Sequence, residues 1–253
     1  MPRTSVEIRT QDGLCPASVF RPAQGGPWPA VLIYMDANGI RPALFELGER
    51  IASHGYLVLL PDLFYRVGPY APINAKELAS DPPRRQEWFA KYMPSASRAN
   101  VREDTAAFLR FLEAQRDVVQ PKIGTTGYCM GGGHSLIAAG TYPDRVAAAA
   151  SYHGGRLATD EPDSPHLLAP RMKAKVYVAG AVEDATFPDE MKQRLAEAFT
   201  AAGVDHRIET YEGAHHGWVP TDTMAHQPKG AERHWQTLIA LFDEVLKGAR
   251  DFR

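Results

Sequence analysis

Gly-Tyr-Cys-Met-Gly-Gly-Gly, at residues 127–133, is the most informative stretch of this sequence. A segment at 122–126 that can form a strand precedes it, and a helical pattern from His134 to Gly140 follows it. A strand, a sharp turn and a helix in this order are the context of a nucleophile elbow, whose central side chain projects from the end of a sheet. The glycines lack a Cβ, so the strand and the helix can approach closely. The pattern therefore predicts that Cys129 is a nucleophile.

Two other interpretations of this turn are open. Glycine runs between a strand and a helix also bind phosphates, but no Gly-Lys-Ser/Thr follows and the Gly-x-Gly-x-x-Gly spacing is not present. A buried free cysteine is usually inert packing. Because only a thiolate attacks well, a catalytic Cys129 needs a base or a local positive field from elsewhere in the chain.

The composition is ordinary for a soluble globular protein, with 44% hydrophobic and 23% charged residues in 253. The formal net charge of −2 and the scattered Lys and Arg residues favour neither nucleic acid nor a membrane surface as partner. The two cysteines, Cys15 and Cys129, fit a reducing compartment rather than a disulfide framework. We see no signal peptide, and the apolar runs are far shorter than the roughly 20 residues of a membrane span. We therefore expect a cytoplasmic protein.

Strand and helix patterns alternate along the chain, which predicts a mostly parallel sheet with right-handed crossovers. A turn signal at 11–13 separates two strand patterns, which predicts an N-terminal hairpin. No stretch has the composition of an interdomain linker, so we expect one domain over residues 1–253. The expected strands are 5–10, 15–20, 30–35, 56–60, 122–126, 147–152, 175–179 and 206–211. The expected helices are about 44–54, 74–80, 83–92, 98–116, 134–140, 189–201 and 231–247.

Three polar side chains each follow a strand of this sheet: Cys129, Asp184 and His216. Ligands bind at this end of the strands in open α/β sheets, and nucleophile, acid and histidine come in the α/β-hydrolase order. His216 would take the thiol proton and later activate water against the thioester, while Asp184 would orient the imidazole. The backbone N–H groups of Met130 and Ala37 are the expected oxyanion hole.

Neighbouring residues leave part of this assignment open. Glu183 stands beside Asp184 and His215 beside His216, and each of these residues alone is more often a turn, cap or loop residue. The histidine pair has no further ligands at zinc-like spacing, so we expect no metal, and nothing indicates an organic cofactor.

These motifs together resemble the dienelactone hydrolase (carboxymethylenebutenolidase) family. The elbow at 127–132 is similar down to the Tyr and the Cys, and the loop at 180–188 resembles the acid loop of the family, where a proline follows the Asp four residues on. The segment 211–218 resembles the histidine loop, and 61–66 resembles the Pro-Asp-Leu-x-x-Arg segment. The similarity runs from about Val6 to the C-terminal helix, and it selects Asp184 and His216 over their neighbours.

The resemblance implies an α/β-hydrolase fold without a large cap domain, with helices on both faces of the sheet. It also implies hydrolysis of a small ester or lactone through an acyl-cysteine. In the family a Glu after the third strand holds the resting thiol, and Asp36, whose alternative role is helix capping, stands at that position here. Two arginines bind a substrate carboxylate in the family: Arg66 matches the first, and Pro220 stands near the position of the second.

Further residues are weaker candidates for the site. Tyr128 and Trp218 are candidates for substrate binding or thiol regulation, although such aromatics are more often packing residues. Tyr34 and Tyr70 are candidates for the pocket wall by the same argument, and Arg41 is a candidate second carboxylate ligand. His153 has two interpretations, as a residue that lines the pocket or as a polar residue at a strand end.

Two other functions fit the same residues. A thiol beside a histidine is also oxidisable, so a non-catalytic or redox-responsive protein on a hydrolase scaffold is the main alternative. Thioesterase or peptidase activity would use the same triad, and the fold does not set the substrate.

Overall fold

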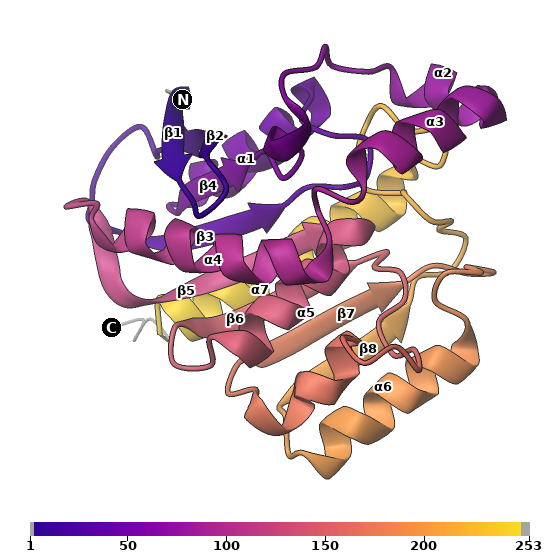
Figure 1. Cartoon of the computed structure of the whole chain (residues 1–253). Coiled ribbons are helices and arrows are strands. Elements are labelled where there is room, and N and C mark those ends of the chain that lie inside the picture. Colours follow the sequence, from indigo (N-terminus) through magenta and orange to yellow (C-terminus); the bar gives the residue numbers. More distant parts are fainter. Residues whose placement is uncertain (1–2, 249–253) are drawn as a thin grey trace.

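A computed structural model describes residues 3–248. Its centre is an eight-stranded sheet of order β1-β2-β4-β3-β5-β6-β7-β8 (Figure 1). Strands β1 and β2 form the expected hairpin and β2 pairs antiparallel with β4, while all the other neighbours are parallel, so the predicted mostly parallel sheet is confirmed. The strands are β1 Arg3–Arg9, β2 Leu14–Phe20, β3 Trp28–Tyr34, β4 Leu57–Pro61, β5 Val118–Tyr128, β6 Val146–Tyr152, β7 Lys175–Gly180 and β8 His206–Thr210.

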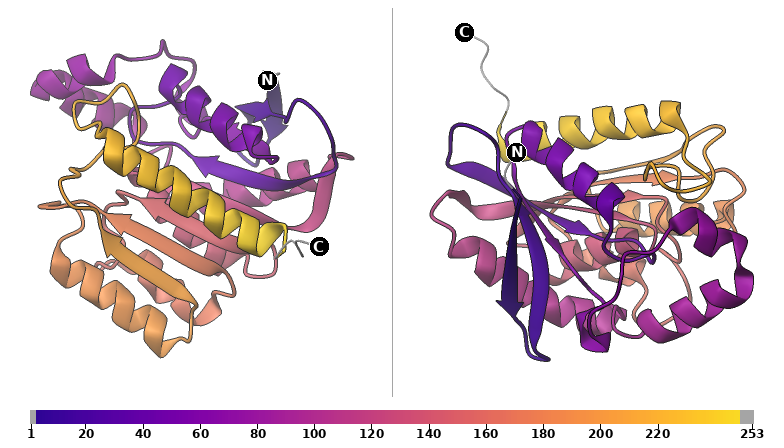
Figure 2. Two further views of the ribbon diagram at one scale, coloured as in Figure 1. Left: turned by 180° about the vertical axis from the view of Figure 1, so that it is seen from behind. Right: turned by 90° about the horizontal axis from the view of Figure 1, so that it is seen from above.

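Helices cover both faces of the sheet (Figures 1 and 2). Helices α1 and α7 lie on one face, and α4 and α5 lie on the other. The short helices α2 and α3 stand beyond the carboxyl ends of the parallel strands. The helices are α1 Pro42–Ser53, α2 Ala75–Ser80, α3 Pro82–Tyr92, α4 Arg98–Glu113, α5 Met130–Thr141, α6 Asp189–Ala201 and α7 Pro228–Leu246, with 3₁₀ turns η1 Tyr65–Val67 and η2 Pro165–Arg171. No helix within residues 3–248 has the length and apolar character needed to cross a bilayer.

The central strands are buried on both faces because helices flank the sheet on either side. In β3, for example, Val31, Leu32 and Ile33 are all fully buried. The continuous apolar runs in the sequence are the signature of such strands, which is why the expected strands match the observed ones to within a few residues. Their carboxyl ends meet at one edge of the sheet, and the polar loops gather there.

Helix α5 starts earlier than its apolar pattern suggested. It begins at Met130, four residues before His134, because the glycines of the elbow are its first turn. A Cβ on Gly131 would lie 2.2 Å from the carbonyl oxygen of Tyr34. Only glycine lets the helix pack this closely against β3, so residues with poor helix propensity form its start.

Candidate active site

Cys129 sits in a strained turn between β5 and α5. Its φ of 54° and ψ of −117° lie where residues with a Cβ are rare. A Cβ on Gly127 would lie 1.9 Å from the carbonyl oxygen of Gly131, so the close approach needs glycine. The N–H of Cys129 donates to the carbonyl oxygen of Tyr152 at 3.1 Å and to Nδ1 of His153 at 3.0 Å. This is the geometry expected of a nucleophile elbow, and Cys129 is partly exposed to solvent.

The loops after β7 and β8 bring Asp184 and His216 together. Nδ1 of His216 donates to Oδ2 of Asp184 at 2.7 Å. The other carboxylate oxygen accepts hydrogen bonds from the backbone N–H and the hydroxyl of Thr186, at 2.9 and 2.7 Å. The neighbouring Glu183 and His215 are exposed to solvent. The acid–histidine contact in this structure is therefore the one that the family resemblance selected.

The pKa values of this pair follow from their surroundings. Burial by itself would lower the pKa of His216, but its electrostatic interaction with Cys129 and its hydrogen bonds with Asp184 and Cys129 raise it to about 10. Burial would raise the pKa of Asp184, yet hydrogen bonds from His216 and Thr186 lower it to about 2. At neutral pH the pair is therefore an imidazolium and a carboxylate, with the imidazolium beside the cysteine sulfur.

These three residues line a cavity of about 1010 Å³, which is of the size of small-molecule sites. Both Met130 and Ala37, the expected sources of the oxyanion hole, also line it. Met130 is the first residue of α5, so its N–H has no acceptor within the helix. The carbonyl oxygen of Ala37 accepts a hydrogen bond from the indole of Trp88 in α3 at 2.9 Å, which holds its loop in place.

Asp36 lines the same cavity, but its carboxylate is occupied. Oδ1 accepts hydrogen bonds from Arg41 at 2.7 Å and from the N–H of Asn38 at 2.9 Å, and Oδ2 accepts from Arg41 at 2.9 Å. Arg41 is fully buried and also binds Asp222. Arg41 therefore joins two loops through its ion pairs and does not line the cavity.

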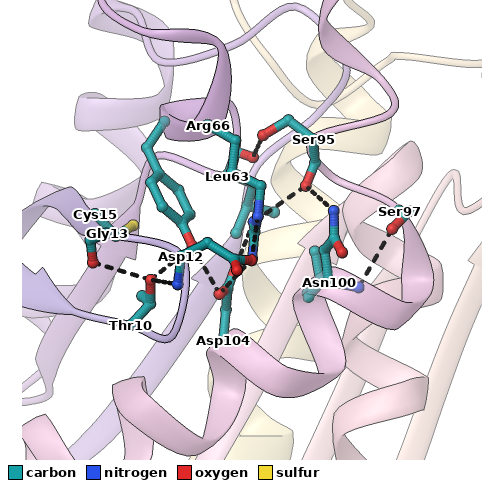
Figure 3. Close-up of polar contacts among 12 residues, drawn as sticks. Thr10, Asp12, Gly13, Cys15, Leu63, Arg66, Ser95, Ser97, Asn100 and Asp104 are labelled. Carbon is teal, nitrogen blue, oxygen red and sulfur yellow. Dashed lines mark hydrogen bonds and ion pairs between the residues drawn. The ribbon is translucent and has the colours of Figure 1, made fainter.

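Arg66 does not line the cavity, contrary to the expected carboxylate-binding role. Figure 3 shows its side chain beside Asp104 and Asp12. Its two terminal nitrogens each donate at 2.8 Å to a different oxygen of Asp104, and its Nε donates to Asp12 at 2.7 Å. The guanidinium therefore joins η1 to α4 and to the turn between β1 and β2. The Pro-Asp-Leu-x-x-Arg similarity did not indicate these partners, because they come from distant segments.

Tyr128 and Trp218 are fully buried and do not line the cavity. The hydroxyl of Tyr128 pairs with Nε2 of His234 at 3.0 Å, and Trp218 packs edge-on against His153 with ring centroids 4.9 Å apart. Of the weaker candidates, His153 does line the cavity, although it is fully buried. The buried aromatics support the wall from behind, which is the packing role that such residues usually have.

Tyr34 and Tyr70, the other two aromatic candidates, are also outside the cavity wall. Tyr34 is fully buried and its hydroxyl pairs with the hydroxyl of Thr105 at 2.7 Å. The hydroxyl of Tyr70 accepts a hydrogen bond from the N–H of Ile40 and donates to Asp62, both at 2.9 Å. Both tyrosines therefore join elements of the fold.

The structure adds cationic side chains that the sequence did not single out. Arg85 and Phe89, from α3, line the cavity, and the Arg85 guanidinium lies over the Phe89 ring. Arg85 forms no ion pair with any residue in the described part of the chain, whereas Arg98, which also lines the cavity, is paired with Asp163. The only sequence signal was the abundance of Arg and aromatic residues between 61 and 97. Within residues 3–248, no group of three or more His, Cys, Asp or Glu side chains is arranged so that it could hold a metal ion.

Known proteins resemble this chain in both sequence and fold. The model of the "Dienelactone hydrolase family" matches residues 15–246. A relative from Synechocystis sp. named "Putative carboxymethylenebutenolidase" is 24% identical over 96% of this chain and 97% of its own length. One of the same name from Methylorubrum extorquens is 28% identical over 92% of this chain and 78% of its own.

Among solved structures, a "Putative Dienelactone Hydrolase" from Klebsiella pneumoniae subsp. pneumoniae superposes with a TM-score of 0.83. It shares 23% sequence identity and the match covers 96% of this chain and 98% of that one. At this identity the likeness concerns the fold, and it confirms the predicted α/β-hydrolase fold. The family match over most of its length shows that the chain belongs to the dienelactone hydrolase family and is a hydrolase of carboxylic esters or lactones.

Proposed function

We propose that the chain hydrolyses a small ester or lactone through an acyl-cysteine, with Cys129 as nucleophile, His216 as acid–base and Asp184 as its partner. The observation that carries the proposal is the contact of 2.7 Å between His216 and Asp184 at the cavity, with the imidazolium beside the sulfur. A paired imidazolium is the local positive field that a thiolate nucleophile requires.

In the first step the thiolate sulfur attacks the carbonyl carbon, and the backbone N–H groups of Met130 and Ala37 bind the oxyanion. The C–O bond breaks, and the leaving oxygen takes the proton of His216. In the second step neutral His216 takes a proton from water while the water oxygen attacks the thioester. The C–S bond then breaks, which restores the thiolate–imidazolium pair and releases the acid. In a lactone the alcohol stays attached to the product.

We propose further that the substrate carries a negatively charged group, such as a carboxylate, that binds Arg85. This guanidinium lines the cavity and has no carboxylate partner among the described residues. An arginine fork matches a carboxylate with two parallel hydrogen bonds. In this proposal Arg85 takes the role for which the sequence suggested Arg66.

The test is hydrolysis of a dienelactone, followed by ultraviolet absorbance, beside a neutral ester of similar size. Cys129→Ala should abolish turnover of both substrates while the protein stays folded. A hydrolysis rate in this variant equal to that of the wild type would contradict the acyl-cysteine mechanism. Arg85→Ala should lower kcat/KM for the dienelactone about 10-fold or more, because a hydrogen bond to a charged group contributes about that much. The kcat/KM for the neutral ester should stay unchanged. An equal loss for both substrates would contradict anion binding by Arg85.

The alternatives correspond to other outcomes when thioesters, peptides and peroxide are tested beside these two substrates. Turnover of thioesters or peptides alone would keep the triad and change the substrate class. No turnover of any ester, together with fast reaction of Cys129 with peroxide, would favour the redox-responsive protein. We also propose that residues 1–253 form one domain, since the family match covers 15–246, and that the protein is cytoplasmic, since Cys15 and Cys129 are both free thiols.

A further inference from the structure

His153 follows the last residue of β6 and is fully buried beside Cys129. Its backbone N–H donates to the carbonyl oxygen of Ala179 at 2.8 Å, and its Nδ1 accepts the N–H of Cys129 at 3.0 Å. Its φ of 41° lies in the left-handed region, which is unfavourable for most residues with a Cβ. Strain of this kind persists where the surrounding structure imposes it, and it concentrates at functional sites.

The hydrogen bond from Cys129 determines the protonation of this imidazole. A ring nitrogen that accepts a hydrogen bond carries no proton, so neutral His153 has its proton on Nε2. Protonation of Nδ1 would break this bond and would place a second cation beside His216, whose ring centroid is 5.4 Å away. Burial, and then the charges of His216 and His234, hold the pKa of His153 well below its usual range, against the opposing charge of Asp184. His153 is therefore neutral in the folded protein.

The N–H of Cys129 is shared between two acceptors, the carbonyl oxygen of Tyr152 and Nδ1 of His153. These acceptors fix the orientation of the peptide unit that leads into the strained turn. Rotation of that unit would move the sulfur relative to His216 and to the N–H of Met130. Displacements of about 1 Å at reacting atoms can cost about 10²-fold in rate.

We propose that His153 is a positioning residue for the nucleophile: as a neutral acceptor it orients the elbow, and it leaves His216 as the one imidazolium beside the sulfur. The inference deepens the proposed function, since it takes Cys129 to be the nucleophile. It assigns no direct contact between His153 and the substrate.

Two substitutions separate the hydrogen bond from the backbone strain. His153→Gly and His153→Asn both tolerate the positive φ, but only asparagine keeps an acceptor close to the position of Nδ1. We expect His153→Gly to lower kcat about 10- to 100-fold with KM changed less than about 2-fold, and His153→Asn to keep kcat within about 3-fold of the wild type. The rate at which iodoacetamide alkylates Cys129, followed by mass spectrometry at several pH values, should fall in the glycine variant and recover in the asparagine variant.

Equal kcat values for the glycine variant and the wild type would overturn the inference, and so would equal losses in both variants. A measurement on the wild type does not depend on how the variants fold: ¹⁵N shifts of the His153 ring should report the neutral Nε2–H tautomer. An Nδ1–H tautomer or an imidazolium would contradict it. Activity of the Cys129→Ala variant would contradict the proposed function. If the Cys129→Ala variant is inactive and the His153→Gly variant is fully active, only this inference is contradicted.

Discussion

Arg41 binds both carboxylate oxygens of Asp36, at 2.7 and 2.9 Å, and both side chains are buried. The same guanidinium binds Asp222 at 2.6 and 3.1 Å, in the loop between β8 and α7. One buried arginine thus joins the loop that follows β3 to the loop region that follows His216. On this side, Asp36 contributes to the cavity wall as part of an ion-pair network in which one guanidinium binds two carboxylates.

Loss of Asp36 should therefore reduce stability. Asp36→Ala leaves the buried Arg41 with a single carboxylate, and breaking a buried pair costs about 3–5 kcal/mol. We expect a decrease of about 3 kcal/mol in the free energy of unfolding in urea. Glu232→Ala, which removes the exposed partner of Arg50, is the control and should cost less than about 1 kcal/mol. Equal stability of Asp36→Ala and the wild type would mean that the network contributes nothing.

Arg66 should be important for stability and unimportant for substrate choice. Arg66→Ala leaves the carboxylate of Asp104, whose side chain is 1% exposed, without its cation, and about 3 kcal/mol should be lost. The ratio of kcat/KM for the dienelactone to that for the neutral ester should match the wild type. A selective loss of the dienelactone in the folded variant would show instead that Arg66 reaches the substrate.

The stability of the site should depend on pH in two windows. The pKa of His216 is raised from 6.5 to about 10, so its contribution is fully present below 6.5 and is lost as the pH rises to about 10. The pKa of Asp184 is lowered from 3.8 to about 2, so its contribution is present above 3.8 and is lost as the pH falls towards 2. Urea unfolding of the wild type and His216→Ala should therefore differ less at pH 10 than at pH 6.5. A constant difference over this range would contradict the raised pKa.

Asp184 should be important for turnover. Asp184→Asn removes the charge that stabilises the imidazolium and can favour the wrong tautomer, so kcat should fall about 10²- to 10⁴-fold. The matched control is Glu183→Gln, whose exposed side chain precedes Asp184. It should change kcat less than about 2-fold, and the opposite order of the two effects would reassign the acid.

The glycines of the elbow should differ in their tolerance of a methyl group. A Cβ on Gly131 would lie 2.2 Å from the carbonyl oxygen of Tyr34, so Gly131→Ala should displace the turn and cost about 1–3 kcal/mol. At Gly133 the nearest atom would be 3.7 Å away, and alanine there should be neutral or add up to about 1 kcal/mol of helix stability. Thermal unfolding of both variants measures the difference, and similar Tm values would contradict the packing argument.

Much of the fold could be predicted from the chain alone, because its signals are local. Apolar runs and helical periodicity located the strands and helices, and the glycine pattern at 127–133 identified the turn at Cys129. The resemblance to the family also selected Asp184 and His216, which the structure brings into contact. Their catalytic roles stay predictions.

The ion pairs depended on tertiary structure. Arg66 is separated by 38 residues from Asp104, and Arg41 by 181 from Asp222, so no periodicity or motif relates them. A charged side chain pairs with an oppositely charged group that tertiary packing brings within a few ångströms of it. A local motif does not indicate which group that is. The sequence therefore determined the order of the elements and the residue type at the elbow turn. Packing alone decided that Arg66 and Arg41 bind carboxylates of the protein, while Arg85 faces the cavity.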